Sequence, residues 1–253
     1  MLLTRPLHSA AFLRAHGLGV EVHTDQSVPE DLLPFVYGVH LPYVGLNLAA
    51  LDEKVRLDSL QFLKNELERG CRFPVDRMVV HTVGIETEKG VRVGDYEQLI
   101  RSFRELADFA AEKRIILCIE NQVLRPSVKR FGDNAAEWLA LPGDIGRKNI
   151  LLTLDSSHAA TSAAIYEDYA VRLHCLDEFL SRPELIGRVH WSDARLRNRE
   201  ALYNDMHMVP GRGDLPREFH RRVHQLPAVK LLEQKCTEAD VLEGLKFIAS
   251  LDD

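Results

Sequence analysis

Residues 115–120, IILCIE, and residues 150–155, ILLTLD, decide the fold of this chain. Both runs are apolar almost to their last residue, and residues 77–81, RMVVH, follow the same pattern. A strand that is apolar on both faces must be buried on both faces, which is typical of a parallel sheet covered by helices. We therefore predict a buried parallel sheet to which these three runs contribute strands.

Further strands and helices extend this pattern over the whole chain. Five more runs complete the strand prediction, at residues 2–4, 19–23, 35–40, 187–190 and 229–233. Residues 96–110, 166–180 and 241–249 each carry an apolar stripe at the three-to-four spacing of an amphipathic helix. Eight strands that alternate with helices predict an α/β fold, a single (βα)8 TIM barrel over residues 1–253. A doubly wound sheet is less favoured, because the chain has no GxGxxG loop.

The composition is that of a globular protein and limits the partners and the cellular compartment that we expect for it. Of the 253 residues, 45% are hydrophobic and 28% are charged, and the formal net charge is −6, which gives no electrostatic argument for a nucleic-acid or membrane partner. No apolar run approaches the roughly 20 residues that span a bilayer. We expect a cytoplasmic protein with no membrane association, and no obligate protein partner is evident. The cysteines are too scattered for a disulfide framework; they are Cys71, Cys118, Cys175 and Cys236.

Six successive predicted strands end on an imidazole or a carboxylate, which are the ligand types that divalent zinc or manganese accepts. In a (βα)8 barrel the C-terminal strand ends surround one mouth, so these side chains are expected to converge. They are His40, His81, Glu120, Asp155, His190 and Glu233.

Two loop motifs add three ligands to the same rim. His158 follows the strand that ends at Asp155, and Asp205 and His207 follow the seventh strand. Nine ligands are too many for one ion and suit two or three. Each residue alone is more simply explained as a structural residue or a helix cap, and it is their convergence that favours a metal site. The other histidines are interpreted as structural or exposed: His8, His16, His23, His174, His220 and His224.

Several segments together resemble the endonuclease IV family (AP endonuclease family 2), within the xylose-isomerase-like barrel superfamily. HLPYVGLNLA at residues 40–49 is similar to that family's His-x-x-Tyr-x-x-Asn-Leu segment. VVHTVG, CIEN, LTLDSSHAA, RVHWSDAR, DMH and LLEQ follow in the family's order, so that the resemblance covers about residues 35–235.

This resemblance implies a site of up to three zinc ions. His40, His81 and Glu120 would hold the first ion, and Glu120 would bridge to a second, held also by Asp155, His190 and Glu233. His158, Asp205 and His207 would hold the third. The implied activity is metal-dependent hydrolysis of a phosphodiester in DNA at an abasic site, or of a related phosphate ester, with Glu120, Asp155 and Glu233 as catalytic residues.

The same resemblance predicts substrate contacts, and at some positions this sequence differs from the family. Tyr43 matches the tyrosine that the family inserts at the damaged site, and Arg212 is a further predicted substrate contact. Arg195, like His158, is predicted to contact sugar hydroxyls under the alternative function given below. Residues 23–31, HTDQSVPED, are acidic where the family has a basic segment, and Arg212 stands where the family usually has glutamate.

A sugar or sugar-phosphate isomerase or epimerase of the same superfamily is the alternative function. One Mn²⁺, Mg²⁺ or similar ion would then be held by Glu120, Asp155, His190 and Glu233, and the two glutamates would move a proton next to a carbonyl. Such an enzyme has no need of His40, His81, Asp205 and His207. A third possibility is a barrel that binds metal without turnover, because fold and ligands do not guarantee catalysis.

Overall fold

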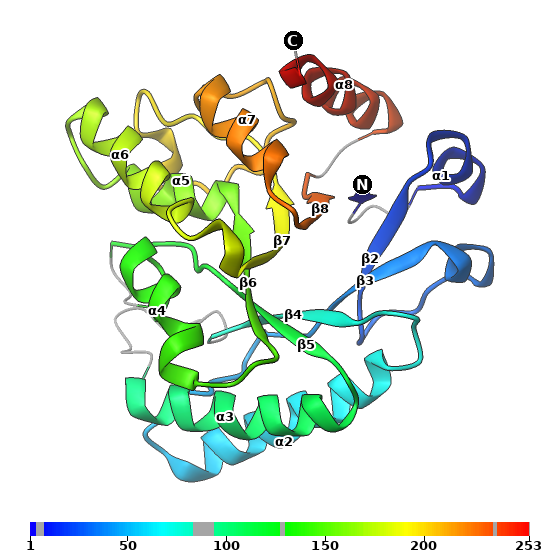
Figure 1. The fold of residues 1–253 in the computed structure, drawn as a ribbon, viewed down its shortest axis with the longest axis vertical. Coiled ribbons are helices and arrows are strands. Elements are labelled where there is room, and N and C mark those ends of the chain that lie inside the picture. Colours follow the sequence, from blue (N-terminus) through cyan, green and yellow to red (C-terminus); the bar gives the residue numbers. More distant parts are fainter. Residues whose placement is uncertain (4–7, 83–93, 127–129, 235–236, 253) are drawn as a thin grey trace.

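The computed structural model describes residues 1–3, 8–82, 94–126, 130–234 and 237–252. Eight parallel strands form a closed barrel in chain order, in which β8 pairs with β1 (Figure 1). The predicted single (βα)8 TIM barrel is confirmed. The strands are β1 Leu2–Leu3, β2 Gly19–His23, β3 Val36–His40, β4 Arg77–His81, β5 Ile116–Glu120, β6 Ile150–Asp155, β7 Ile186–Trp191 and β8 Val229–Leu232.

Helices cover the outside of the barrel, and the three helices predicted from apolar stripes are present as α3, α6 and α8. Figure 1 shows α2 and α3 side by side along one flank of the barrel. The α-helices of the described residues are α1 Ala10–His16, α2 Glu53–Gly70, α3 Tyr96–Glu112, α4 Ala135–Ile145, α5 Ser156–Ala163, α6 Tyr169–Phe179, α7 Arg217–Gln225 and α8 Glu238–Ala249.

The strand predictions differ from the structure only at their ends. β2, β4 and β6 have the expected bounds, whereas β7 is longer by one residue at each end and Glu233 lies directly after β8. Thr4, the expected end of the first strand, lies outside the described residues, as does Cys236. Apolar runs locate a buried strand well, but its last residue depends on pairing with its neighbours.

The connection from β2 to β3 departs from the regular alternation. It holds a 3₁₀ helix, Glu30–Phe35, in place of an α-helix. Tyr37 of β3 is 55% exposed, and Leu33 of this 3₁₀ helix is 44% exposed.

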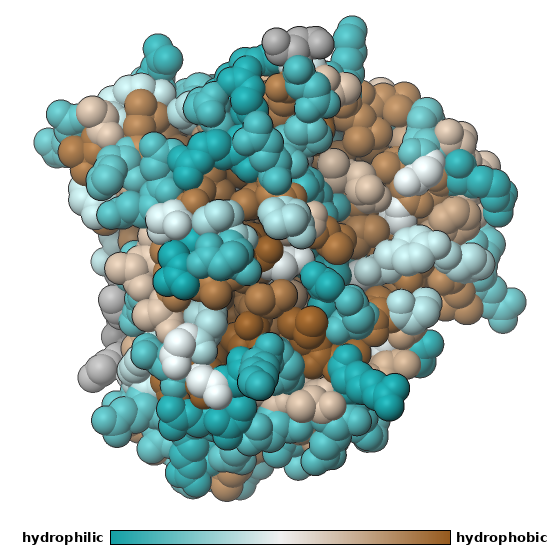
Figure 2. All heavy atoms as spheres, viewed as in Figure 1, coloured by the Kyte–Doolittle hydropathy of each residue, from teal (hydrophilic) through white to brown (hydrophobic). Residues whose placement is uncertain are grey.

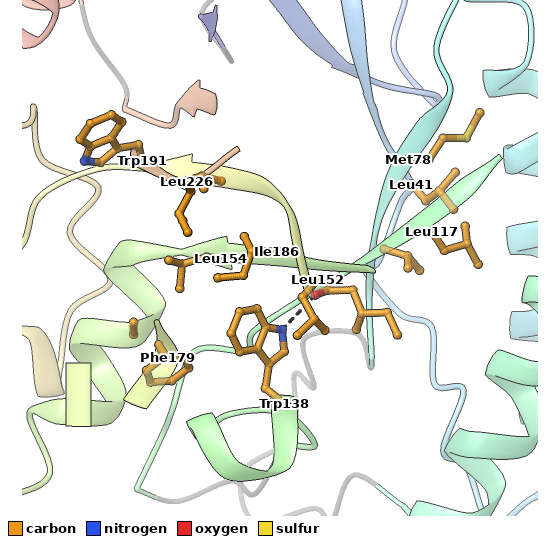
Figure 3. Packing of buried hydrophobic residues seen from close by; sticks show 14 of the residues in the cluster. Leu41, Met78, Leu117, Trp138, Leu152, Leu154, Phe179, Ile186, Trp191 and Leu226 are labelled. Atoms are coloured by element: carbon orange, nitrogen blue, oxygen red, sulfur yellow. Dashed lines mark hydrogen bonds between the residues drawn. The ribbon is translucent and has the colours of Figure 1, made fainter. Parts of the chain in front are cut away.

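The core between barrel and helices fixes the strand that carries Glu120. Trp138 of α4 is fully buried, and its indole Nε1–H donates a hydrogen bond of 2.9 Å to the carbonyl of Ile119 in β5 (Figure 3). Phe179 of α6 packs against the same indole, with ring centroids 5.6 Å apart. The helix layer therefore contacts β5 one residue before its last position.

The surface is that of a barrel with polar outer helices. Figure 2 shows hydrophilic side chains over the periphery of one face and hydrophobic side chains gathered toward its middle. Among the described residues, the helices are all too short or too polar to cross a membrane.

Candidate metal centre

The C-terminal ends of the strands bring the predicted ligands together at one mouth of the barrel. His81 pairs in register with Glu120, and Asp155 pairs with His190 on the neighbouring strand. Side chains in register on adjacent parallel strands lie on the same level of the barrel. The convergence expected from the strand ends is therefore what the structure shows.

Glu120 lies at the middle of this cluster and is only 1% exposed. Its Oε2 is 3.3 Å from Nε2 of His40 and 3.3 Å from Nε2 of His81. The same oxygen is 3.3 Å from Nδ1 of His190, while Oε1 is 3.3 Å from Nδ1 of His158. One carboxylate thus faces imidazoles from four different segments, which suits a bridging ligand.

The side chains form three groups, and within each group the ligand atoms lie within 4.8 Å of one another. Two of them share Glu120, and two of them share Asp155. The groups are His40, His81 and Glu120; Asp155, His158 and His207; and Glu120, Asp155, His190 and Glu233.

Asp205 adjoins the second group. Its Oδ2 is 2.9 Å from Nε2 of His207 and 3.3 Å from Nε2 of His158. The resemblance places Asp205 in the third ligand set, and its carboxylate is closer to both histidines than that of Asp155, which is 3.8 Å from His158 and 3.9 Å from His207. The assignment of each ligand to one ion remains a prediction.

Hydrogen bonds fix the orientation of the histidines. His40 donates from Nδ1 to the carbonyl of Leu41 at 2.7 Å, which leaves Nε2 facing Glu120. His158 donates from Nδ1 to the carbonyl of Asn121 at 2.8 Å. Histidine ligands of metals commonly donate their other N–H in this way.

The backbone of Asp155 is also held in place. The side-chain amide of Asn121 donates to the carbonyl of Asp155 at 3.0 Å and accepts from its N–H at 2.6 Å. Oδ1 of Asp155 accepts the backbone N–H of His158 at 2.8 Å and so caps helix α5. One carboxylate oxygen is thereby used by the fold, and Oδ2 is left for the mouth.

The donor atoms fit a bound divalent cation. Among the described residues, Oδ2 of Asp155, Oε2 of Glu233, Nδ1 of His190 and Nδ1 of His207 are buried and make no hydrogen bond. Buried polar atoms are rarely left unpaired. Four such atoms in one region indicate that a cation binds there and accepts their lone pairs. Carboxylate oxygens and imidazole nitrogens together suit zinc or manganese.

The electrostatics of the site show how strongly these groups interact. Burial disfavours the charged form of Glu120, but the charges of His190 and then His81 hold its pKa well below the usual range. Burial raises the pKa of Asp155 to about 8, against the opposing effect of His158 and His207. Glu233 and Asp155 raise the pKa of His207 to about 10, although burial acts in the other direction. Ligands of a cation must be deprotonated, so metal binding at this site competes with protons.

The loop after β7 holds Asp205 and His207 against helix α5. Ser157 Oγ donates to Oδ1 of Asp205 at 2.8 Å and accepts the N–H of Met206 at 3.1 Å. His207 has a φ of +40°, a strained conformation for a non-glycine residue. Backbone strain of this kind clusters at functional sites.

Of the three predicted substrate contacts, Tyr43 alone is next to the ligand cluster. Its ring stacks on His81, with centroids 4.2 Å apart and an angle of 6° between the planes. The guanidinium of Arg195 is 3.6 Å from Glu200, and that of Arg212 pairs with Asp240 and Glu243 of α8. The side chains of both arginines are exposed, and their roles as substrate contacts stay predictions.

Two residues of β2 also lie at the site. The ring of His23 stacks on that of His40, with centroids 4.5 Å apart and an angle of 14°. Oε1 of Glu21 is 3.0 Å from Nε2 of His190. The sequence prediction interpreted His23 as structural or exposed and did not consider Glu21. The alternation of GVEVH, with Glu21 and His23 on one face, is the signal that could have found both.

Comparison with known proteins agrees with this fold. A family described as xylose isomerase-like TIM barrel matches residues 13–251. The D-psicose 3-epimerase of Agrobacterium fabrum is 27% identical over 179 residues, which are 67% of this chain and 53% of that enzyme. The chain thus spans about half the length of that relative.

Solved structures show the same architecture. A D-tagatose 3-epimerase-like protein has a TM-score of 0.71 at 20% identity, with 92% of this chain and 87% of that chain covered. The IOLI protein, solved with a binding zinc atom, has a TM-score of 0.68 at 17% identity and covers 96% and 89%. The family match extends over nearly the whole chain, and we conclude that this protein belongs to the xylose isomerase-like TIM barrel family.

Proposed function

We propose that the protein is a divalent-metal-dependent sugar epimerase or isomerase that moves a proton on a carbon next to a carbonyl. The observation that carries the proposal is the group of ligands from four successive strands, which contains two glutamates. The epimerase names of the relatives in sequence and structure support the same reaction class. The group consists of Glu120, Asp155, His190 and Glu233.

Epimerisation needs one group that removes a proton and one that returns it, and two carboxylates at one site provide them. We assign Glu120 and Glu233 as the pair that exchanges protons with the substrate. One of them, ionised, takes the proton from the carbon next to the carbonyl, and the electron pair of the broken C–H bond moves to give an enediolate. The other, which must carry a proton once the sugar is bound, returns that proton to the opposite face of the carbon. The configuration is inverted, and nothing is oxidised or reduced.

A bound divalent cation would supply positive charge that stabilises the enediolate oxygen. Glu120, Asp155, His190 and Glu233 would hold it. Asp155 is suited to this because its Oδ1 is engaged at the start of α5 and its Oδ2 makes no hydrogen bond. We propose Mn²⁺, Mg²⁺ or Zn²⁺ as the ion, and His158 as a contact for a sugar hydroxyl.

Phosphodiester hydrolysis stays the second candidate. The specific observation in its favour is that two further ligand groups exist, one with His40 and His81 and one with His158 and His207. An epimerase with one ion needs neither group, whereas a site of three zinc ions would use both. The names of the relatives favour the epimerase, and none of those reported above is a nuclease.

Deuterium exchange tests the proposal directly. The Mn²⁺-loaded protein is incubated in D₂O with D-fructose, D-tagatose and D-psicose, and with their phosphates. We expect one deuterium to enter next to the carbonyl of an accepted sugar, as read by proton NMR and mass spectrometry. Glu120→Gln is expected to lower the exchange rate by about 10²–10⁴-fold, the usual contribution of a general base.

A nuclease would give a different set of results. Incision of a duplex with a stable abasic analogue, together with three zinc ions per chain and no deuterium in any sugar, would contradict the epimerase and favour phosphodiester hydrolysis.

A further inference from the structure

A charged network lies one level below the candidate metal centre, inside the barrel. Glu21 is the middle residue of β2 and is 4% exposed, and Arg188 of β7 is 1% exposed. Oε2 of Glu21 accepts a hydrogen bond from Nη1 of Arg188. Oε1 of the same carboxylate accepts from Nε2 of His190 at 3.0 Å. One side chain thus joins a buried guanidinium to a ligand of the centre.

Gly38 of β3 provides the space for this network. A Cβ atom at Gly38 would lie 2.6 Å from Nη1 of Arg188 and 2.8 Å from Oε2 of Glu21. Contacts of that length are not tolerated, so any larger residue at this position must displace the ion pair. β3 therefore has a glycine at the point where the carboxylate of Glu21 and the guanidinium of Arg188 meet.

The bond to Glu21 decides which nitrogen of His190 is available as a ligand. A carboxylate accepts and cannot donate, so Nε2 of His190 must carry the hydrogen in this contact. In the neutral imidazole that binds a metal, the lone pair of His190 is then on Nδ1, which is 3.0 Å from Oε2 of Glu233 and 3.3 Å from Oε2 of Glu120. Nδ1 is also one of the buried atoms that make no hydrogen bond among the described residues.

Two other histidines of the centre are oriented differently, by backbone carbonyls. His40 and His158 donate to the backbone carbonyls of Leu41 and Asn121. Those acceptors are parts of the chain next to the site and cannot be lost by substitution. At His190 the acceptor is a side chain from the other side of the barrel, so this ligand depends on a second residue.

We infer that Glu21 is a positioning residue of the metal centre: it holds His190 with Nδ1 directed at the cation, and Arg188 and Gly38 hold Glu21 in place. The inference rests on the proposed metal-dependent function. It adds to the proposed ligands a residue that supports one of them and touches neither cation nor substrate. Partners of this kind typically change metal affinity by about 10- to 100-fold when they are removed.

The test replaces the whole buried ion pair, because removal of one partner would leave an uncompensated charge. Glu21→Leu/Arg188→Met removes both charges and the acceptor for His190. Glu21→Gln/Arg188→Met removes both charges but keeps an amide oxygen that can accept from Nε2. The control is Glu66→Gln, a buried carboxylate of α2 that accepts from Thr24 and pairs with Arg69 and is not part of the network.

Zn²⁺ affinity, measured by competition with a chromophoric chelator, is the first readout. We expect the Leu/Met variant to bind about 10- to 100-fold more weakly, and the Gln/Met variant and Glu66→Gln to bind as the parent does. Gly38→Ala, which alters no polar group, is expected to weaken binding in the same direction as the Leu/Met variant. Circular dichroism shows whether each variant is folded. A folded Leu/Met variant with the affinity of the parent would overturn the inference.

A second readout separates this inference from the proposed function. In protein labelled with ¹⁵N-histidine, we expect a low-field Nε2–H proton for His190, assigned by its loss in His190→Asn. It should disappear in the Leu/Met variant and return in the Gln/Met variant, with or without Zn²⁺. If the signal behaves so but no divalent metal binds the parent, the metal-dependent function is wrong while the contact stands. If metal binds and the signal is absent from the parent, the role of Glu21 is wrong.

Discussion

His81 is the residue that best separates the two candidate functions. It contacts Glu120 and lies under the ring of Tyr43, but it does not belong to the four-ligand group from β5 to β8. Its importance therefore depends on whether a second ion is needed.

We expect His81→Ala to leave most sugar epimerisation intact, with a loss of less than about tenfold, because the four ligands that an epimerase needs are unchanged. Phosphodiester hydrolysis by a site of several ions would instead fall by orders of magnitude. Steady-state rates on the accepted sugar and on an abasic duplex check this, with Glu120→Gln as the variant that should abolish either activity. A loss of epimerisation by His81→Ala as large as that of Glu120→Gln would contradict the assignment.

The convergence of the strand-end candidates could be predicted from the sequence because it follows from topology alone, while their role as ligands stays a prediction. Every parallel strand of a barrel ends at the same mouth, so the last residue of each run is placed without knowledge of packing. Glu21 could not be placed in this way. The alternation of GVEVH places Glu21 and His23 on one face of the strand but does not say which face points inward. In the structure the carboxylate of Glu21 points inward, where it pairs with both Arg188 and His190.

At the scale of elements, the junction of β6 and α5 links folding to the candidate site. Asp155 is the last residue of β6 and the N-cap of α5: its Oδ1 caps the helix, and its Oδ2 is left for the candidate metal centre. Substitutions at this position should therefore change stability and metal binding separately.

Asp155→Asn keeps an oxygen for the N-cap, whereas Asp155→Ala loses both oxygens. We expect both variants to lose metal-dependent activity, and the alanine variant to be less stable than the asparagine variant by about 1 kcal/mol, the usual contribution of an N-cap. Chemical denaturation without added metal measures the difference. Equal stabilities of the two variants would show that the cap contributes nothing here.

The elements themselves could be predicted in kind and in order, and the deviations have local causes. The apolar stripe of residues 96–110 became α3, whose N-cap Asp95 accepts from the N–H of Gln98. The segment between β2 and β3 has no long amphipathic stripe and forms only a 3₁₀ helix. The side chain of Arg212 could not be placed from sequence, because its ion pairs with Asp240 and Glu243 depend on how α8 packs.

At the scale of the molecule, a centre whose candidate ligands come from the ends of six strands should couple metal binding to global stability. A ligand that binds only the folded state stabilises it by about 2.7 kcal/mol at 100 times its dissociation constant. For a chain of this size that corresponds to roughly 5–10 °C in Tm.

We therefore expect a chelator to lower the Tm of the metal-loaded protein by several degrees, and Mn²⁺ or Zn²⁺ to restore it. Differential scanning calorimetry measures the change. His190→Asn is the matched control, which should show little response to either treatment. A Tm that is independent of metal in the parent would contradict a metal centre inside the barrel.

The uneven pairing around the barrel has a consequence for how the molecule opens. β3 and β4 pair in register through only two residues each, whereas β4 and β5 pair through five. Amide protons along the β3–β4 seam should therefore exchange with solvent sooner than those of β5, β6 and β7. Opening there separates His40 from His81 and leaves Glu120, Asp155 and His190 on strands that remain paired. Among the described residues, β1 likewise pairs with β2 and with β8 through only two residues each, so Glu233 after β8 also borders a short seam. We therefore expect Glu120, Asp155 and His190 to stay together longest when the barrel opens.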